Sequence, residues 1–177
     1  MLWIDKYRPK EFDDIVGNYD IINQFKNMVK KDLLRHIIIT GNVGLGKSST
    51  INCLCTQYLT NKEDNLLEIN MSIDRNVSDI RTTLDDFIKQ RSTEKKIVIL
   101  EEVDNLPDST QYAITSMMNR NVIFFLICNR IDKLITPLQS KCLLINFSEI
   151  SNNDIQVGLE KILELENISY EKDALKK

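Results

Sequence analysis

A glycine-rich octapeptide, Gly41-Asn42-Val43-Gly44-Leu45-Gly46-Lys47-Ser48, joins an apolar run at residues 37–40 to a helical pattern at 49–59. It carries glycine, lysine and hydroxyl at every position of a phosphate-binding loop, in the strand–loop–helix context of such loops. Glycines let the backbone N–H groups point at phosphate oxygens, and the following helix N-terminus favours an anion. The alternative is an ordinary glycine-containing turn. We predict that the chain binds a nucleoside triphosphate.

Five apolar runs predict buried strands, and helical patterns separate them. The runs are continuous rather than alternating, which is typical of strands covered on both faces. One of the helical patterns, 108–119, opens with a capping signature, Asp108 followed by Gln111. This alternation predicts an α/β fold, a five-stranded parallel sheet with helices on both faces. The expected strands are residues 35–40, 66–70, 96–100, 122–128 and 143–147, and the other expected helices are 20–31 and 77–91.

The pattern changes after Phe147. Residues 151–154 read as a second capping box, which opens an amphipathic helix. We expect its inward face to consist of Ile155, Leu159, Ile162 and Leu163. The polar end, 171–177, looks like the start of another helix, so we expect a second module of which only the beginning is present.

Composition limits the possible functions. The chain has 177 residues, of which 42% are hydrophobic, enough for one core and the start of a second. Its 23 Lys+Arg and 26 Asp+Glu give a net charge of −3, which argues against a basic coat for nucleic acid but allows a local basic patch. We find neither a membrane-length apolar run nor a signal-peptide pattern, and we expect a soluble intracellular protein.

The four cysteines and the single histidine do not suggest a metal site. Cys53 and Cys55 lie two apart on an expected helix, so their side chains diverge, and Cys128 and Cys142 lie in or beside expected strands. None has the spacing of zinc ligands, and we interpret them as small buried hydrophobic residues. For His36 we expect a solvated or capping role.

Polar residues follow two of the expected strands. The run 96–100 ends in Glu101-Glu102, and the run 122–128 ends at Asn129. One carboxylate beside a phosphate-binding loop can organise Mg²⁺, and its neighbour can polarise the attacking water. The amide of Asn129 suits positioning of a water or sensing of the γ-phosphate, and Lys141 places a cation before the last strand. Alone, these residues would be read as solvated turn and surface residues.

Several motifs together resemble the small subunits of replication factor C, the clamp loaders of eukaryotes and archaea. The opening Trp3-Ile4-Asp5-Lys6-Tyr7-Arg8-Pro9, followed by Asp14-Ile15-Val16-Gly17-Asn18, is similar to the start of that family. So are residues 67–75, with an Asn-x-Ser-x-Asp-Arg pattern, Ile127-Cys128-Asn129, and residues 137–142 with Ser140-Lys141-Cys142. The resemblance covers essentially the whole chain.

The resemblance implies an AAA+ ATPase domain over residues 1–148 and the beginning of a helical lid over 149–177, without the collar domain that holds five subunits in a ring. It further implies a chain that binds ATP and Mg²⁺ and works with other clamp-loader subunits, a sliding clamp and primer–template DNA. In a eukaryotic cell the expected location is the nucleus. ATP binding would close the ring on clamp and DNA, and hydrolysis would release the loaded clamp.

The resemblance also assigns roles residue by residue. The adenine pocket would be lined by Ile4, Arg8 and Val16, while Glu101 would organise the metal, Glu102 would activate water and Asn129 would sense the γ-phosphate. Lys141 would reach the neighbouring subunit's ATP site, and Arg75 and Arg81 would face DNA phosphates. The remaining nucleotide contacts are expected from Asn42, Val43, Gly44, Leu45, Gly46, Lys47, Ser48 and Ser49, with Ser48 also at the Mg²⁺.

Three departures from the family pattern bear on activity. Glu101 stands where the family has Asp, Lys141 where it has the trans-acting Arg, and Thr115-Ser116 where it has an Arg pair, with a shortened loop before the sensor strand. Each change weakens a functional position, so we expect slow hydrolysis. Alternatives are a subunit that binds nucleotide without turnover and another AAA+ machine, such as a helicase loader or branch-migration motor. A small-molecule kinase fits less well, because no acceptor-binding lid is evident.

Overall fold

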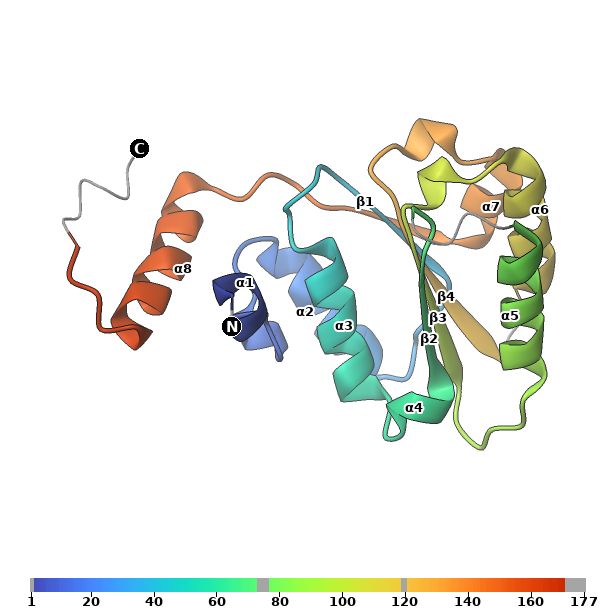
Figure 1. Ribbon diagram of the computed structural model, residues 1–177, viewed down its shortest axis with the longest axis horizontal. Helices are drawn as coiled ribbons and strands as arrows, with labels where there is room; N and C mark the ends of the chain where they lie inside the picture. The colour runs from blue at the N-terminus through green and yellow to red at the C-terminus, as the bar shows by residue number, and fades with distance from the viewer. Residues whose placement is uncertain (1, 73–76, 119–120, 171–177) are drawn as a thin grey trace.

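A parallel β-sheet forms the centre of the protein (Figure 1). The computed structural model describes residues 2–72, 77–118 and 121–170. Within them the sheet has five strands in the order β2-β3-β4-β1-β5, and every neighbouring pair is parallel. This confirms the predicted architecture. Each strand lies within one of the expected apolar runs, except that β3 extends one residue beyond its run. The bounds are β1 Ile37–Thr40, β2 Leu66–Asn70, β3 Lys96–Glu101, β4 Val122–Ile127 and β5 Leu143–Asn146.

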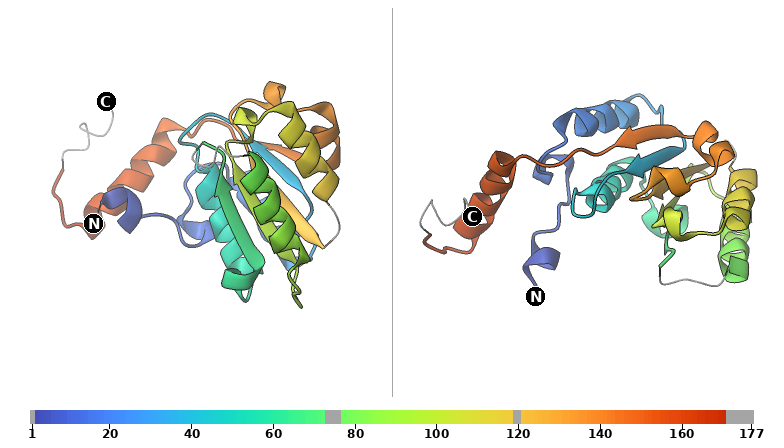
Figure 2. Two further views of the ribbon diagram at one scale, coloured as in Figure 1. Left: turned by 45° about the vertical axis from the view of Figure 1, so that its right-hand side comes forward. Right: turned by 90° about the horizontal axis from the view of Figure 1, so that it is seen from above.

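Helices cover both faces of the sheet (Figures 1 and 2). One face is covered by α2 (Tyr19–Lys30) and α3 (Lys47–Tyr58). The other face is covered by α5 (Val77–Lys89), α6 (Asp108–Met117) and α7 (Thr136–Lys141). The short elements are α1 (Trp3–Lys6), α4 (Lys62–Asn65) and the 3-10 turns η1 (Phe12–Asp14), η2 (Val103–Asn105) and η3 (Ile131–Lys133), and the chain continues into α8 (Asn152–Leu165).

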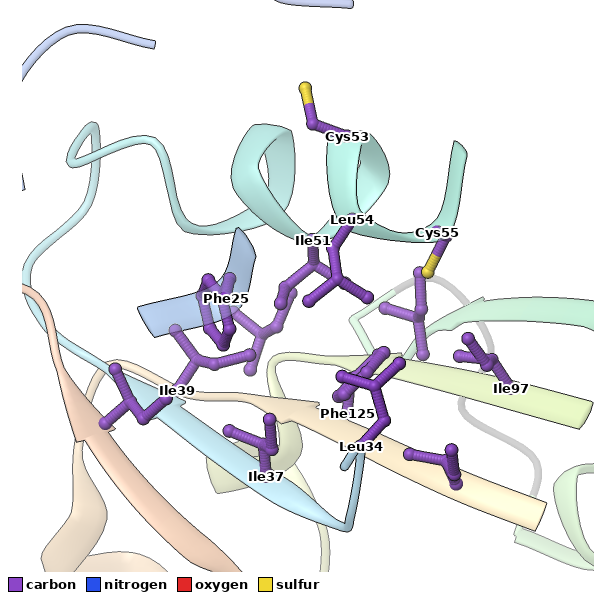
Figure 3. Close-up of a cluster of buried hydrophobic side chains, with 14 of the residues drawn as sticks. Phe25, Leu34, Ile37, Ile39, Ile51, Cys53, Leu54, Cys55, Ile97 and Phe125 are labelled. Atoms are coloured by element: carbon purple, nitrogen blue, oxygen red, sulfur yellow. The ribbon is translucent and has the colours of Figure 1, made fainter. Parts of the chain in front are cut away.

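Each face of the sheet has its own hydrophobic core. Successive strand residues point to opposite faces, so Ile37 and Ile39 of β1 join the core under α2 and α3, whereas Ile38 joins the core under α5 and α6. In the first core, Phe25 and Phe125 are fully buried (Figure 3). Burying one such side chain stabilises the fold by about 1.5–3 kcal/mol. The continuous apolar strands therefore predicted the two-sided covering correctly.

The predicted burial of the cysteines is confirmed for three of the four. Cys53, Cys55 and Cys128 are buried and Cys142 is partly buried, all as free thiols. Figure 3 shows Cys53 and Cys55 leaving α3 in different directions. Burial raises the pKa of Cys55 to about 12, so it remains a neutral thiol. In the part of the chain that the structure describes, no three or more His, Cys, Asp or Glu side chains are grouped as a set of metal ligands.

The expected role of His36 is wrong. Its side chain is half-buried, and Nδ1 accepts a hydrogen bond of 3.2 Å from the backbone N–H of Phe124 in β4. The ring also contacts the Phe124 ring, with centroids 5.8 Å apart. Burial, and secondarily the positive charge of Lys141, lowers the pKa of His36. His36 thus satisfies a strand amide as a neutral acceptor instead of facing solvent or capping a helix.

The expected capping signature of α6 is also wrong. Pro107 is the N-cap, and no side chain caps the helix. Gln111 is fully buried instead, and its Nε2 donates to the carbonyls of Leu106 (3.0 Å) and Lys133 (3.1 Å). Its Oε1 accepts from the backbone N–H of Ile135 (2.9 Å). The hydrogen bonds of Gln111 therefore connect the turn that follows β3 with the turn that follows β4, two turns that are distant from each other in the sequence.

Helix α8 lies away from the sheet, beside the N-terminal segment (Figure 2). The N-cap half of the predicted capping box is confirmed, because Ser151 Oγ accepts from the Asp154 N–H at 3.1 Å; Asp154 Oδ2 in turn accepts from Ser151 Oγ at 2.6 Å. Glu166 accepts hydrogen bonds from Lys6 Nζ (2.7 Å) and Tyr7 Oη (2.8 Å). However, none of the α8 residues is buried, and Ile155 remains 44% exposed. The expected inward face is therefore only partly covered.

Over residues 2–72, 77–118 and 121–170, none of the helices is long and apolar enough to cross a bilayer.

Candidate active site

The glycine-rich loop emerges at the carboxyl edge of the sheet, between strands that carry the other expected site residues. Strand β1 lies inside the sheet, with β4 on one side and the edge strand β5 on the other. Ile39 pairs with Ile127, and Ile127 pairs with Glu101, so the ends of β1, β4 and β3 reach the same edge. In open parallel sheets this edge is where ligands bind. The register therefore brings the loop, the carboxylates and Asn129 together.

Two glycines are required by the geometry of the loop. Gly41 has φ of +142°, and an added Cβ would lie 2.7 Å from the Phe147 carbonyl oxygen just beyond β5. Gly46 has φ of +83° and is the N-cap of α3, whose first residue is Lys47. A larger residue would clash at the first position and would be strained at both. The glycines thus allow the chain to turn sharply from β1 into the N-terminus of α3.

Lys47 lies at the centre of the loop, and its side chain is buried, with only 7% exposed. Its Nζ donates to the carbonyls of Gly41 and Asn42, both at 2.7 Å, and to Oδ1 of Asn129 at 3.0 Å. Burial lowers its pKa, and the nearby Cys128, Asp104 and Glu101 oppose that shift. The ammonium is therefore a partly desolvated positive charge, which an anionic ligand would stabilise.

A cavity of about 270 Å³ lies over the loop. Helix α3 begins at this cavity, so backbone N–H groups at its N-terminus favour an anion there. The cavity brings together nearly all the residues expected at the phosphates, and the Asn42 carbonyl lies beside it as an acceptor for Lys47. The lining comprises Val43, Gly44, Leu45, Gly46, Lys47, Ser48, Ser49, Glu101, Glu102, Ile127, Cys128 and Asn129.

The two carboxylates approach this cavity because the strand ends between them. Glu101 is the last residue of β3, and Glu102 adopts the left-handed conformation, with φ of 55° and ψ of 42°. This conformation costs a residue other than glycine on the order of 1–3 kcal/mol and is often found at functional sites. Glu101 Oε2 accepts from Asn70 Nδ2 (3.4 Å), and Glu102 Oε2 accepts from Asn105 Nδ2 (2.9 Å).

A second cavity, of about 450 Å³, adjoins the first and shares Gly44, Gly46 and Ser49 with it. It lies between the N-terminal segment and α8. Gly158 allows the close approach of α8, because an added Cβ would lie 3.1 Å from Val16 Cγ2. The cavity has a mixed lining, with apolar side chains that suit a flat base and several charged side chains, among them Arg8. Its lining includes Tyr7, Arg8, Ile15, Val16, Ile150, Ile155, Leu159 and Ile162.

Not every expected site residue lies at these cavities. Arg8 and Val16 line the second cavity, but Ile4 does not line it and is 78% exposed in α1. Lys141 is exposed, and its Nζ donates to the Thr115 carbonyl near the end of α6 at 2.7 Å. Arg81 is exposed on α5, and Arg75 lies outside the described residues.

Sequence reasoning missed some residues of the site. The amphipathic pattern of α8 was visible, but nothing in the sequence indicated that Ile155, Leu159 and Ile162 would line a cavity with the N-terminal segment. Asp104, two residues beyond Glu102, was given no role, although it is the third acid at the end of that strand. Both omissions concern contacts between segments that are distant in the sequence.

The sequence of this chain is similar to a known family and to several known proteins. Residues 37–149 match the family described as "ATPase family associated with various cellular activities (AAA)". The chain is 34% identical over 181 residues to "Replication factor C subunit 4" of Saccharomyces cerevisiae, covering 98% of this chain and 56% of that protein. It is 35% identical over 179 residues to "Replication factor C small subunit" of Methanothermobacter thermautotrophicus, covering 98% and 56%. The chain thus spans about half the length of these relatives.

Among solved structures, the Holliday junction branch migration motor RuvB of Thermotoga maritima is similar in fold. The TM-score is 0.78, with 15% sequence identity, and the match covers 96% of this chain and 58% of that one. At this level of identity the likeness concerns the fold alone.

Proposed function

Because this chain belongs to the AAA family of ATPases, we propose that it binds and hydrolyses ATP as a small subunit of a clamp loader similar to replication factor C. The observation that carries the proposal is the pair of adjoining cavities. One lies over the glycine-rich loop and is lined by Lys47, and the other lies between the N-terminal segment and α8. Their common boundary at Gly44, Gly46 and Ser49 suits a ligand with a phosphate chain on one side and a base on the other.

In this proposal the loop backbone and Lys47 bind the phosphates. Lys47 would exchange its bonds to the Gly41 and Asn42 carbonyls for bonds to phosphate oxygens, which are stronger because both partners are charged. Arg8 and Val16 would contact the base. Ile4, which is exposed, would have to move to reach it. The role of each residue is a prediction.

The oxygen ligands in the first cavity fit Mg²⁺, which prefers hydroxyl and carboxylate groups. Ser48 and Glu101 both line that cavity and would hold the ion, which neutralises charge that develops on the phosphates. Glu102 would accept the proton of the attacking water, and Asn105 holds its carboxylate at 2.9 Å. Asn129 would sense the γ-phosphate by contacting it. Its Oδ1 already accepts a hydrogen bond of 3.0 Å from Lys47 Nζ.

The clamp-loader assignment depends on similarity that extends beyond the AAA match. The relatives align with 98% of this chain, including the N-terminal segment and α8, which lie outside residues 37–149. We propose residues 1–148 as the ATP-binding domain and 149–177 as the start of a lid. The proposed partners are the other subunits of a five-membered ring, a sliding clamp and primer–template DNA, in the nucleus if the cell is eukaryotic.

The assignment is tested by co-expressing the chain with the clamp-loader subunits of the same genome. We expect the chain to co-purify with them and the complex to load the clamp on primed circular DNA only when ATP is present. A chain that binds ATP but does not enter the complex would contradict the clamp-loader role. A chain that binds no ATP would contradict the whole proposal.

A second candidate is a subunit that occupies its ring position with little or no hydrolysis. Two observations favour it. Glu101 is one methylene longer than the expected aspartate, and Lys141 is bonded to the Thr115 carbonyl of its own chain at 2.7 Å. Lys141 would have to leave that carbonyl to reach a neighbouring subunit. Single-turnover hydrolysis by the complex separates the two candidates.

Replacing Lys141 with arginine should raise the ATPase rate of the complex at the neighbouring subunit's site. Arginine presents a planar fork that can hold two phosphate oxygens, whereas lysine offers one compact charge. We expect a several-fold gain, well below the roughly 10³–10⁵-fold effect of a well-placed trans arginine. The control is Lys133→Arg, the same change at an exposed residue of η3. A gain in the isolated chain would contradict the trans assignment.

Arg75 and Arg81 should contribute to DNA binding by the complex, with no comparable effect on the isolated chain. If both contact phosphates, replacing them with glutamine should flatten the salt dependence of affinity by roughly one unit of slope per lost contact. The matched control replaces Arg35 and Arg91, which are exposed near the opposite, amino-terminal edge of the sheet. An unaltered salt slope in the Arg75/Arg81 variant would argue against the role.

A further inference from the structure

Asp104 lies in η2, the turn that leads away from Glu101 and Glu102. It is partly buried, and it follows Val103, which is fully buried and fixes the turn against the second core. Asp104 does not line either of the two cavities. Its side chain is directed instead toward the turn that follows β4.

The carboxylate of Asp104 accepts a hydrogen bond from the backbone of that turn. Its Oδ2 accepts from the backbone N–H of Arg130 at 3.2 Å, across 26 residues of sequence. Arg130 directly follows Asn129, whose Oδ1 accepts from Lys47 Nζ at 3.0 Å. A single carboxylate thus connects the turn after β3 to the residue that positions Lys47.

The surroundings of the Asp104 carboxylate also bear on its role. Its negative charge raises the pKa of Lys47, against the larger lowering effect of burial. Its second oxygen, Oδ1, is buried and makes no hydrogen bond with the residues that the structure describes. A buried, unsatisfied carboxylate oxygen is costly and calls for an explanation, of which a role at a functional site is one.

We propose that Asp104 is a positioning residue for ATP hydrolysis: it holds the Arg130 amide and thereby fixes the Asn129 side chain against Lys47. This inference rests on the proposed ATPase function. Without the bond, the turn after β4 can shift relative to the loop, and Asn129 and Lys47 lose their common geometry. Displacements of about 1 Å at a catalytic site can lower the rate on the order of 10²-fold. ATP binding changes less, because the loop itself is intact.

Three variants test this proposal. Asp104→Ala removes the acceptor, whereas Asp104→Asn keeps an oxygen that can accept from the Arg130 N–H. The matched control is Asp132→Asn, because Asp132 also contacts Arg130, but through an exposed ion pair with its guanidinium at 2.7 Å. Two quantities are measured: hydrogen exchange of the Arg130 amide in the chain, and kcat and KM for ATP in the assembled complex.

For Asp104→Ala we expect faster exchange at Arg130 and a kcat lowered by about 10–100-fold, with KM changed by less than about 3-fold. Asp104→Asn should restore slow exchange and most of the rate. Asp132→Asn should change neither, because exposed ion pairs contribute little. If Asp104→Ala does not fold, Asp104→Glu, which keeps the charge but displaces the acceptor, should show the same selective loss of kcat.

The opposite results are equally specific. A parental kcat in Asp104→Ala, or an equal loss in Asp104→Asn and Asp104→Ala, would overturn the positioning role while leaving the ATPase proposal intact. A complex of the parental chain that does not hydrolyse ATP would overturn the proposed function, and this inference with it.

Discussion

Replacing Lys47 with alanine should abolish detectable ATP binding and leave the fold intact. Lys47 is the only charged side chain in the loop, and its buried ammonium is held at 2.7 Å from two loop carbonyls. Charged hydrogen bonds contribute about 1.5–3 kcal/mol each, so losing those to phosphate should weaken binding by about 100-fold or more. The measurement is a nucleotide titration, with circular dichroism as the check on folding.

Lys95→Ala is the control for this experiment. Like Lys47, Lys95 has hydrogen-bond acceptors in the chain, since it donates to the Asp32 carboxylate at 2.9 Å, but it lies just before the first residue of β3, at the edge of the sheet away from the loop. Its removal should leave ATP affinity unchanged. If Lys47→Ala were to bind ATP with the parental affinity while folded, the loop would not be the phosphate site.

Replacing Glu102 with glutamine should keep ATP affinity and block turnover, trapping the complex in its clamp-bound state. Glutamine has nearly the shape of glutamate, so its side chain can still accept from Asn105 Nδ2, but it cannot take a proton from water. Loss of a general base typically costs about 10²–10⁴-fold in rate. The measurement is single-turnover hydrolysis in the reconstituted complex, with ATP affinity titrated in parallel.

The control is Glu63→Gln, because Glu63 is exposed on α4, far from the loop in Figure 1. It should not affect either quantity. Parental turnover in Glu102→Gln would mean that the catalytic role belongs to another residue. If the complex that contains the unsubstituted chain shows no turnover at this subunit, the result would instead support the second candidate function, a subunit with little or no hydrolysis.

The substitution of the neighbouring residue, Glu101→Asp, should change the rate of ATP hydrolysis in the opposite direction. It leaves binding nearly unchanged and accelerates hydrolysis, because aspartate restores the shorter reach expected at the metal. Together the two variants assign different roles to adjacent carboxylates, which the break in the strand at Glu102 brings to one cavity.

The sequence by itself determined the class of fold and the centre of the site. Continuous apolar runs require strands that are buried on both faces, and the alternation with helices requires a parallel sheet. The loop at residues 41–48 combines local features that need no distant partner: glycines at a sharp turn, a lysine and a helix start. The Ser151 cap is local in the same sense, and the structure confirms it.

The tertiary structure decided which distant segments meet. Gln111 was interpreted as a capping residue because it follows Asp108 by three residues. Its side chain instead forms hydrogen bonds with the backbone of Leu106, Lys133 and Ile135. The strand order, which places β4 between β1 and β3, likewise cannot be read from the order along the chain.

The same reason explains the second cavity and Asp104. The cavity exists only because α8 approaches the N-terminal segment at Gly158 and Val16, and Asp104 acquires a partner only because two turns meet at one edge of the sheet. Periodicity and capping patterns record interactions over a few residues, within one helix or strand. Hydrogen bonds and packing between segments 26 or more residues apart depend on the assembled core, and these complete the site.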